Sequence, residues 1–135
     1  MEREQKLKKF LKLVNILEDL RGENGCPWDK KQTHKSLMKY LFEESNEYNE
    51  AVQNQDTENM KEELGDVLLQ VVFHAQIAKE NKMFDIYDVL DTINEKMIRR
   101  HPHVFGNSNA KTEEEIRIEW EQIKAEEKLK KNNKK

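Results

Sequence analysis

LFEESNEYNEAVQNQDTENMKEELGDVLLQVVF, residues 41–73, is the stretch that decides the fold. Its middle, NQDTEN at residues 54–59, consists of residue types that end helices and make turns. The stretch is therefore predicted to form two antiparallel helices joined by a short turn.

Each half of this hairpin carries an acidic pair three residues apart, Glu44 with Glu47 and Glu63 with Asp66, so each pair shares one helix face. The pairs are symmetric about Gln55, which lies 11 residues from positions 44 and 66 and 8 residues from positions 47 and 63. An antiparallel hairpin then brings all four carboxylates to one height. Carboxylates this close raise each other's pKa unless a cation lies among them, so the pattern predicts a metal site.

Oxygen ligands favour a hard cation, above all Mg²⁺, with Mn²⁺ as a substitute. Glu44 follows Leu37 by seven residues on an apolar line, where an uncompensated carboxylate is costly to bury. Two alternatives remain: the acids form solvated helix faces in a chain with 27 acidic residues, or they belong to a di-iron site. A di-iron site would need Glu-x-x-His pairs, which neither acidic pair provides. His74, two turns beyond Asp66, is interpreted as a core histidine.

The composition favours an all-α protein. The 135 residues fit one domain, and 36% hydrophobic and 38% charged residues with only 4 Gly and 2 Pro fit long helices with solvated faces. The low apolar content also fits a core shared between subunits. We predict helices at residues 3–21, 34–54, 57–81, 85–100 and 112–129, a domain core over 7–129 and a disordered basic tail at 130–135.

The chain is expected to be cytoplasmic. The single Cys26 excludes an intramolecular disulfide and fits a reducing compartment. The N-terminus MEREQKLKKF has no apolar signal segment behind it, and no stretch approaches about 18 apolar residues. A net charge of -3 gives no argument for nucleic-acid binding. Neither a membrane nor a nucleic acid is expected as a partner.

A basic cluster follows the predicted helix at 85–100. Lys96, Arg99 and Arg100 lie at its end, with His101 and His103 after them. These cations either cap the carboxyl end of the helix or grip phosphate, with Lys96 and Arg100 on a shared face. A metal site together with a phosphate grip is what a polyphosphate substrate requires.

Two tryptophans are candidates for stacking on a base. Trp28 lies in the loop GCPWD, and Trp120 lies on the last predicted helix with Lys124 one turn later. Each is interpreted either as a packing residue or as a ligand platform.

Five segments together resemble the MazG family of nucleoside triphosphate pyrophosphohydrolases. They are GCPWDKKQT, LFEESNEYNEA, EELGDVLLQVVFHAQIA, INEKMIRRHPHVFG and WEQIKAEEK. The resemblance runs from about Leu13 to Lys128. Its centre is the family pattern E-E-x-x-E followed by E-x-x-D, which is present here as Glu43, Glu44, Glu47, Glu63 and Asp66.

The resemblance implies an all-α NTP pyrophosphatase fold whose helical bundle is completed by dimerisation. It also implies Mg²⁺-dependent hydrolysis of (deoxy)nucleoside triphosphates to the nucleoside monophosphate and pyrophosphate, in nucleotide-pool housecleaning. The expected metal ligands are Glu44, Glu47, Glu63 and Asp66. Glu43 is expected to orient or deprotonate the attacking water.

The resemblance further implies a substrate-binding set outside the hairpin. Asn94, Lys96 and Arg100 match positions near the phosphates, and Lys96 and Arg100 are also expected to act in catalysis. Trp120 and Lys124 match the segment that approaches the nucleotide, in the same subunit or the partner.

Two alternative functions and the size of the oligomer stay open. One alternative is a same-fold enzyme acting on dUTP, phosphoribosyl-ATP or a guanosine alarmone. Another is a non-catalytic metal-binding regulatory protein. The oligomer is either a homodimer or a higher homo-oligomer.

Overall fold

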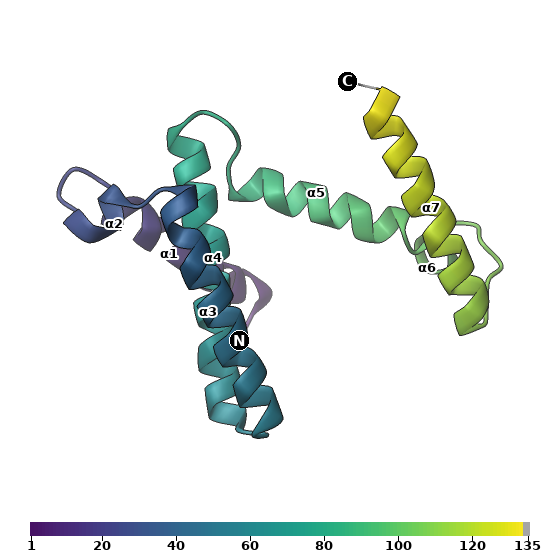
Figure 1. The fold of residues 1–135 in the computed structure, drawn as a ribbon, viewed down its shortest axis with the longest axis horizontal. Helices are drawn as coiled ribbons and strands as arrows, with labels where there is room; N and C mark the ends of the chain where they lie inside the picture. The colour runs from purple at the N-terminus through teal and green to yellow at the C-terminus, as the bar shows by residue number, and fades with distance from the viewer. Residues whose placement is uncertain (134–135) are drawn as a thin grey trace. The chain divides into compact units, whose positions relative to one another are not determined.

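The computed structural model describes residues 1–133. All regular secondary structure in that range is helical, and turns and loops connect the helices (Figure 1). They are α1 (Arg3–Leu20), α2 (Pro27–Lys31), α3 (His34–Gln53), α4 (Thr57–Glu80), α5 (Ile86–Arg99), α6 (Pro102–Phe105) and α7 (Glu113–Asn133). The all-α prediction is confirmed. The short helices α2 and α6 lie outside the helices predicted from the sequence.

The chain divides into two compact units. The first is Met1–Ile86, and the second begins at Tyr87. The first unit holds α1 to α4, and the second holds α6, α7 and nearly all of α5.

The hairpin of the first unit has specific caps at both helix starts. Thr33 begins α3: its hydroxyl accepts from the Ser36 N–H at 3.0 Å, and the Ser36 hydroxyl oxygen accepts from the Thr33 N–H at 2.8 Å. Asp56 begins α4 by accepting from the Asn59 N–H at 3.2 Å. Both arrangements satisfy helix N–H groups that have no intrahelical partner. The turn therefore lies where the NQDTEN segment predicted it.

The chain reverses at Gln55, which adopts a positive φ of 53°. The Asp56 N–H donates to the carbonyl of Ala51 at 3.1 Å and closes the end of α3. This left-handed residue after a helix is the usual way to satisfy the last carbonyls. As a result α4 runs back along α3 (Figure 1).

The core of the first unit lies where α3 and α1 pack against α4. Leu17 of α1, Leu37 of α3 and Val72 of α4 are its most deeply buried large side chains. Arg21, at the end of α1, has a side chain only 8% exposed. It pairs with Glu80 of α4 and donates to two carbonyl oxygens of the loop and α2 region. Arg21 thereby ties this region to the core.

One face of α4 remains uncovered within the first unit. Leu64, Leu68 and Val71 repeat at helical spacing and are 51%, 41% and 40% exposed. Phe42 of α3 is exposed as well. The nearly all-round apolar sequence of α4 predicts partners on every side, whereas α1 and α3 cover only part of it.

In the second unit, Thr112 begins α7: its hydroxyl accepts from the Glu115 N–H at 3.2 Å and donates to the Glu115 carboxylate at 3.0 Å. Thr112 therefore caps the start of α7. The helix continues to Asn133, beyond its predicted end at residue 129. Residues 130–133 are therefore helical rather than a disordered tail, and residues 134 and 135 lie outside the described residues.

Helices in the described range 1–133 are either too short or too polar to span a membrane.

Candidate metal centre

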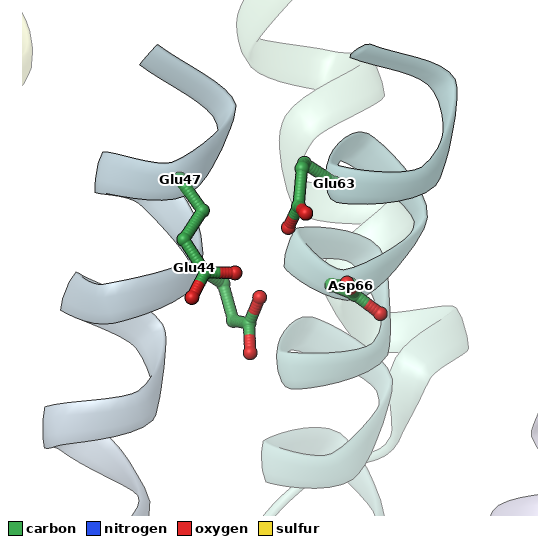
Figure 2. A group of neighbouring side chains, drawn as sticks. All are labelled: Glu44, Glu47, Glu63 and Asp66. Carbon is green, nitrogen blue, oxygen red and sulfur yellow. The ribbon is translucent and has the colours of Figure 1, made fainter. Parts of the chain in front are cut away.

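Four carboxylates converge between α3 and α4. Glu44 and Glu47 project from α3, and Glu63 and Asp66 project from the facing side of α4 (Figure 2). One carboxylate oxygen of each lies within 4.8 Å of the others. This is the convergence that the symmetry about Gln55 predicts. Oxygen atoms this close suit a single small cation, or a pair of cations, with oxygen ligands.

The pKa values reflect this crowding. Burial, with the neighbouring Glu47, Asp66 and Glu44 carboxyls, raises the pKa of Glu63 to about 7. Burial raises the pKa of Glu44 as well, again with help from Glu47 and Asp66. The Glu47 carboxyl is the neighbour that contributes most to the raised pKa of Glu63 after burial. Without a cation the cluster is therefore partly protonated near neutral pH.

Two oxygens of the cluster have no hydrogen-bond partner within the described chain. They are Oε2 of Glu44 and Oε2 of Glu63, and both are buried. Buried polar atoms normally find a partner, and a bound cation or its waters would provide one. The donor set and the two unpartnered oxygens both fit a hard divalent cation.

Glu43 lies beside the cluster but outside it. It is exposed, it directly precedes Glu44, and its charge contributes to the raised pKa of Glu44. It is not among the four residues whose oxygens converge. Its position leaves it open to solvent next to the candidate metal ligands.

A histidine pair lies on the same hairpin, nearer to the start of α3. The Nδ1 atoms of His34 and His74 are 2.8 Å apart, and the rings are nearly parallel with centroids 5.1 Å apart. The sequence indicates a core histidine at His74, and the structure adds a contact with His34 that this interpretation does not include. Positions 34 and 74 lie 21 and 19 residues from Gln55, so the symmetry that paired the acids does not predict this contact.

Trp28 packs against Tyr40 edge to face, with ring centroids 5.7 Å apart and planes at 69°. Its carbonyl also accepts from the Gln32 amide at 2.9 Å. The interpretation of Trp28 as a packing residue therefore has a direct structural basis, although 44% of its surface stays exposed.

The predicted substrate-binding residues all belong to the second unit, whereas the four acids belong to the first. Asn94 and Lys124 are exposed, and Lys96 is half-buried. The Arg100 guanidinium lies over the Trp120 ring, 5.3 Å from its centroid. The second unit thus brings Arg100 and Trp120 into direct contact.

Glu127 is a residue that the sequence did not single out. Its carboxylate accepts from Arg100 at 2.8 Å and from Arg99 at 2.7 Å. These hydrogen bonds, first from Arg100 and then from Arg99, lower the pKa of Glu127 to about 2. The available signal was its spacing of seven residues from Trp120, which puts both on one face of α7.

Residues 32–105 match the model of the MazG nucleotide pyrophosphohydrolase domain. A protein of Thermotoga maritima named nucleoside triphosphate pyrophosphohydrolase/pyrophosphatase MazG is 57% identical over 124 residues, which are 92% of this chain and 47% of that protein. The nucleoside triphosphate pyrophosphohydrolase of Escherichia coli K12 is 46% identical over 89% of this chain and 46% of its own length.

A solved structure agrees with these sequence matches. The crystal structure of a MazG-related protein from Thermotoga maritima superimposes with a TM-score of 0.71 at 30% identity, covering 84% of this chain and 97% of the other. The chain spans about half the length of the Thermotoga maritima and Escherichia coli pyrophosphohydrolases that it matches. The match over residues 32–105 and the shared fold establish that the chain belongs to the MazG nucleotide pyrophosphohydrolase family.

Proposed function

We propose that the protein hydrolyses (deoxy)nucleoside triphosphates between the α and β phosphates and releases the nucleoside monophosphate and pyrophosphate. The observation that carries this proposal is the convergence of four carboxylates within 4.8 Å of one another on one hairpin. The relatives named as nucleoside triphosphate pyrophosphohydrolases support the substrate class. A role in nucleotide-pool housecleaning in the cytoplasm follows as part of the same proposal.

Glu44, Glu47, Glu63 and Asp66 would hold Mg²⁺, with Mn²⁺ as a substitute. The four side chains offer only oxygen atoms, which these hard cations prefer. The raised pKa of Glu63 and the unpartnered oxygens of Glu44 and Glu63 are the features that a cation would relieve. When bound, the cation supplies Lewis-acid polarisation of phosphate oxygens and lowers the pKa of water.

Other residues activate the water and neutralise the charge of the phosphates. Glu43, exposed beside Glu44, orients the attacking water and takes its proton. The water oxygen forms a bond to phosphorus in line with the anhydride oxygen, and the phosphorus–oxygen bond to the leaving group breaks. Lys96 and Arg100 neutralise the charge of the phosphates as the leaving group departs.

Substrate binding extends beyond the phosphates. Asn94 provides a hydrogen-bonding side chain, and Lys96 and Arg100 provide the cations. Trp120 and Lys124 contact the nucleotide, within one subunit or across a dimer. An aromatic ring tolerates every base because each base has a π-face.

A homodimer or higher homo-oligomer is part of the proposal. The open face of α4, formed by Leu64, Leu68 and Val71, is an apolar stripe of the kind that a second copy would cover. Leu68→Glu should lower the molar mass measured by light scattering to that of a monomer. Met83→Glu, which changes an exposed side chain of the α4–α5 loop, serves as the control. A dimer that persists in Leu68→Glu contradicts the assignment of this face.

Pyrophosphate release tests the activity directly. The purified protein is incubated with a panel of nucleoside triphosphates and Mg²⁺, and pyrophosphate is assayed. Glu44→Gln and Asp66→Asn should abolish release while circular dichroism stays unchanged. Glu62→Gln removes an exposed charge next to the cluster and should keep full activity. Full activity in the Glu44 and Asp66 variants overturns the proposal.

The same experiment separates the other candidate functions. Inclusion of dUTP, phosphoribosyl-ATP and a guanosine alarmone in the panel identifies a same-fold enzyme with another substrate. A non-catalytic metal-binding protein would gain thermal stability from Mg²⁺ and turn over none of these compounds.

A further inference from the structure

Glu127 of α7 joins two consecutive arginines at the end of α5. Its Oε1 accepts from Nη2 of Arg100 at 2.8 Å and from Nε of Arg100 at 3.2 Å. Its Oε2 accepts from Nε of Arg99 at 2.7 Å. The side chains of Arg100 and Glu127 are only 17% and 15% exposed. This ion pair is therefore sheltered, unlike the exposed pairs that contribute little to structure.

The guanidinium of Arg100 is restrained on a second side by the Trp120 ring. It lies over the Trp120 ring at 5.3 Å, and the His101 ring meets Trp120 edge to face with centroids 5.2 Å apart. Glu127 occupies one edge of the guanidinium, and Trp120 covers one face. These contacts use Nε–H and one N–H of Nη2, so the two N–H groups of Nη1 and the second N–H of Nη2 are the donors that they leave for a ligand. Glu127 and Trp120 restrict the directions of these donors before any ligand arrives.

Arg99 differs from Arg100 although both bind Glu127. The side chain of Arg99 is 47% exposed. It borders a hollow of about 350 Å³ that is also lined by three carboxylates, Glu119, Glu126 and Glu127, and by one further cation, Lys130. The excess of carboxylates over cations disfavours a phosphate in this hollow. Arg99 therefore helps to anchor the Glu127 carboxylate, and Arg100 is the cation that remains suited to a substrate.

We propose that Glu127 is a positioning residue that holds Arg100 in the orientation that binds the substrate phosphates. This inference rests on the proposed function, in which Arg100 contacts those phosphates. A long arginine side chain loses much rotamer freedom when it binds a ligand. Because Glu127 and Trp120 already restrict Arg100, that loss occurs on folding rather than on binding.

Steady-state kinetics of Glu127 variants test this role. Glu127→Gln and Glu127→Ala should raise the KM for the best nucleoside triphosphate by about tenfold, and should lower kcat by less than about twofold because Arg100 and its charge are retained in both variants. Glu127→Asp keeps the charge on a shorter side chain and should recover part of the lost affinity. This split between KM and kcat, with recovery by aspartate, is not expected from a general loss of structure.

Two controls separate this effect from a change in net charge or folding. Glu126→Gln removes the same charge from the neighbouring, exposed position of α7 and should leave KM unchanged. Circular dichroism and thermal melting identify any variant that fails to fold, and Glu127→Gln preserves the side-chain shape if Glu127→Ala does not fold.

Failure of the inference and failure of the proposed function give different results. A wild-type protein that releases pyrophosphate, with Glu127 variants of unchanged KM, overturns the role of Glu127 alone. A lower KM in Glu127→Gln also overturns it, because Glu127 would then compete with phosphate for Arg100. A wild-type protein that hydrolyses no nucleoside triphosphate overturns the proposed function and the inference with it.

Discussion

His34 and His74 meet through their Nδ1 atoms, which lie 2.8 Å apart between α3 and α4. At this distance one Nδ1 donates its proton and the other accepts it, so the pair tolerates only one Nδ1–H. Protonation of both rings would place two donors and two positive charges against each other. Burial, and the charge of His34, lower the pKa of His74 below its ordinary value of 6.5.

This pair makes stability depend on pH. Because the folded protein holds the proton on His74 less tightly than the unfolded chain does, the contribution of His74 is fully present above about pH 6.5. It is lost as pH falls below that value. Urea denaturation at pH 7.5 and 5.5, compared between wild type and His74→Gln, isolates this contribution, because other titrating groups are common to both proteins. His103→Gln in the second unit is the control, and an identical pH dependence in wild type and His74→Gln contradicts the prediction.

Metal binding should also depend on pH, and here the ionisation of Glu63 determines the dependence. With a pKa of about 7, Glu63 must lose its proton before it can ligate a cation. The apparent affinity for Mg²⁺ should therefore rise by about tenfold from pH 6 to pH 8. Isothermal titration at the two pH values measures this affinity, and equal affinities would show that Glu63 releases no proton on binding.

The raised pKa of Glu63 also makes the stability of the metal-free protein depend on pH. Stability should fall as pH rises from about 4.5 through 7, and Mg²⁺ should restore the lost stability.

Neutralising one acid should stabilise the protein when no metal is present. Glu44 has a raised pKa because of burial and of its neighbours Glu47 and Asp66, so its ionised form is unfavourable in the empty cluster. Glu44→Gln should raise the Tm in EDTA and abolish the further rise that Mg²⁺ gives to wild type. Thermal melts with and without Mg²⁺ test both parts. Glu50→Gln, an exposed position on the same helix, should change neither.

The acid cluster was predictable from the sequence because every relation that builds it is local. The i, i+3 spacing sets the face, and the turn at Gln55 sets the register, so one short loop decides where Glu44, Glu47, Glu63 and Asp66 meet. The short helices α2 and α6 were missed although Pro27 and Pro102 occupy their first turns. Proline at that position is a known helix start, but such short segments look like loops in the sequence.

The contacts of the second unit were not predictable in the same way. The link from Glu127 to Arg100 joins residues 27 positions apart on different helices. Its existence depends on how α7 packs beside α5, which no local spacing determines. The exposed stripe of α4 is a similar case. The helical spacing shows that Leu64 and Leu68 share one apolar face, but it does not show what covers that face.

The backbone conformation of Gln55 destabilises the folded hairpin. Its φ of 53° lies in the left-handed region, which costs an L-residue about 1–2 kcal/mol. Glycine adopts it freely but loses about 0.5–1 kcal/mol in backbone entropy on folding. Gln55→Gly should therefore raise the free energy of unfolding by roughly 0.5 kcal/mol, measured by urea denaturation. Gln53→Gly makes the same chemical change at the last residue of α3, where φ is helical, and should lower it by up to about 1 kcal/mol. Equal effects at the two positions would mean that the left-handed turn at Gln55 is not the source of the difference.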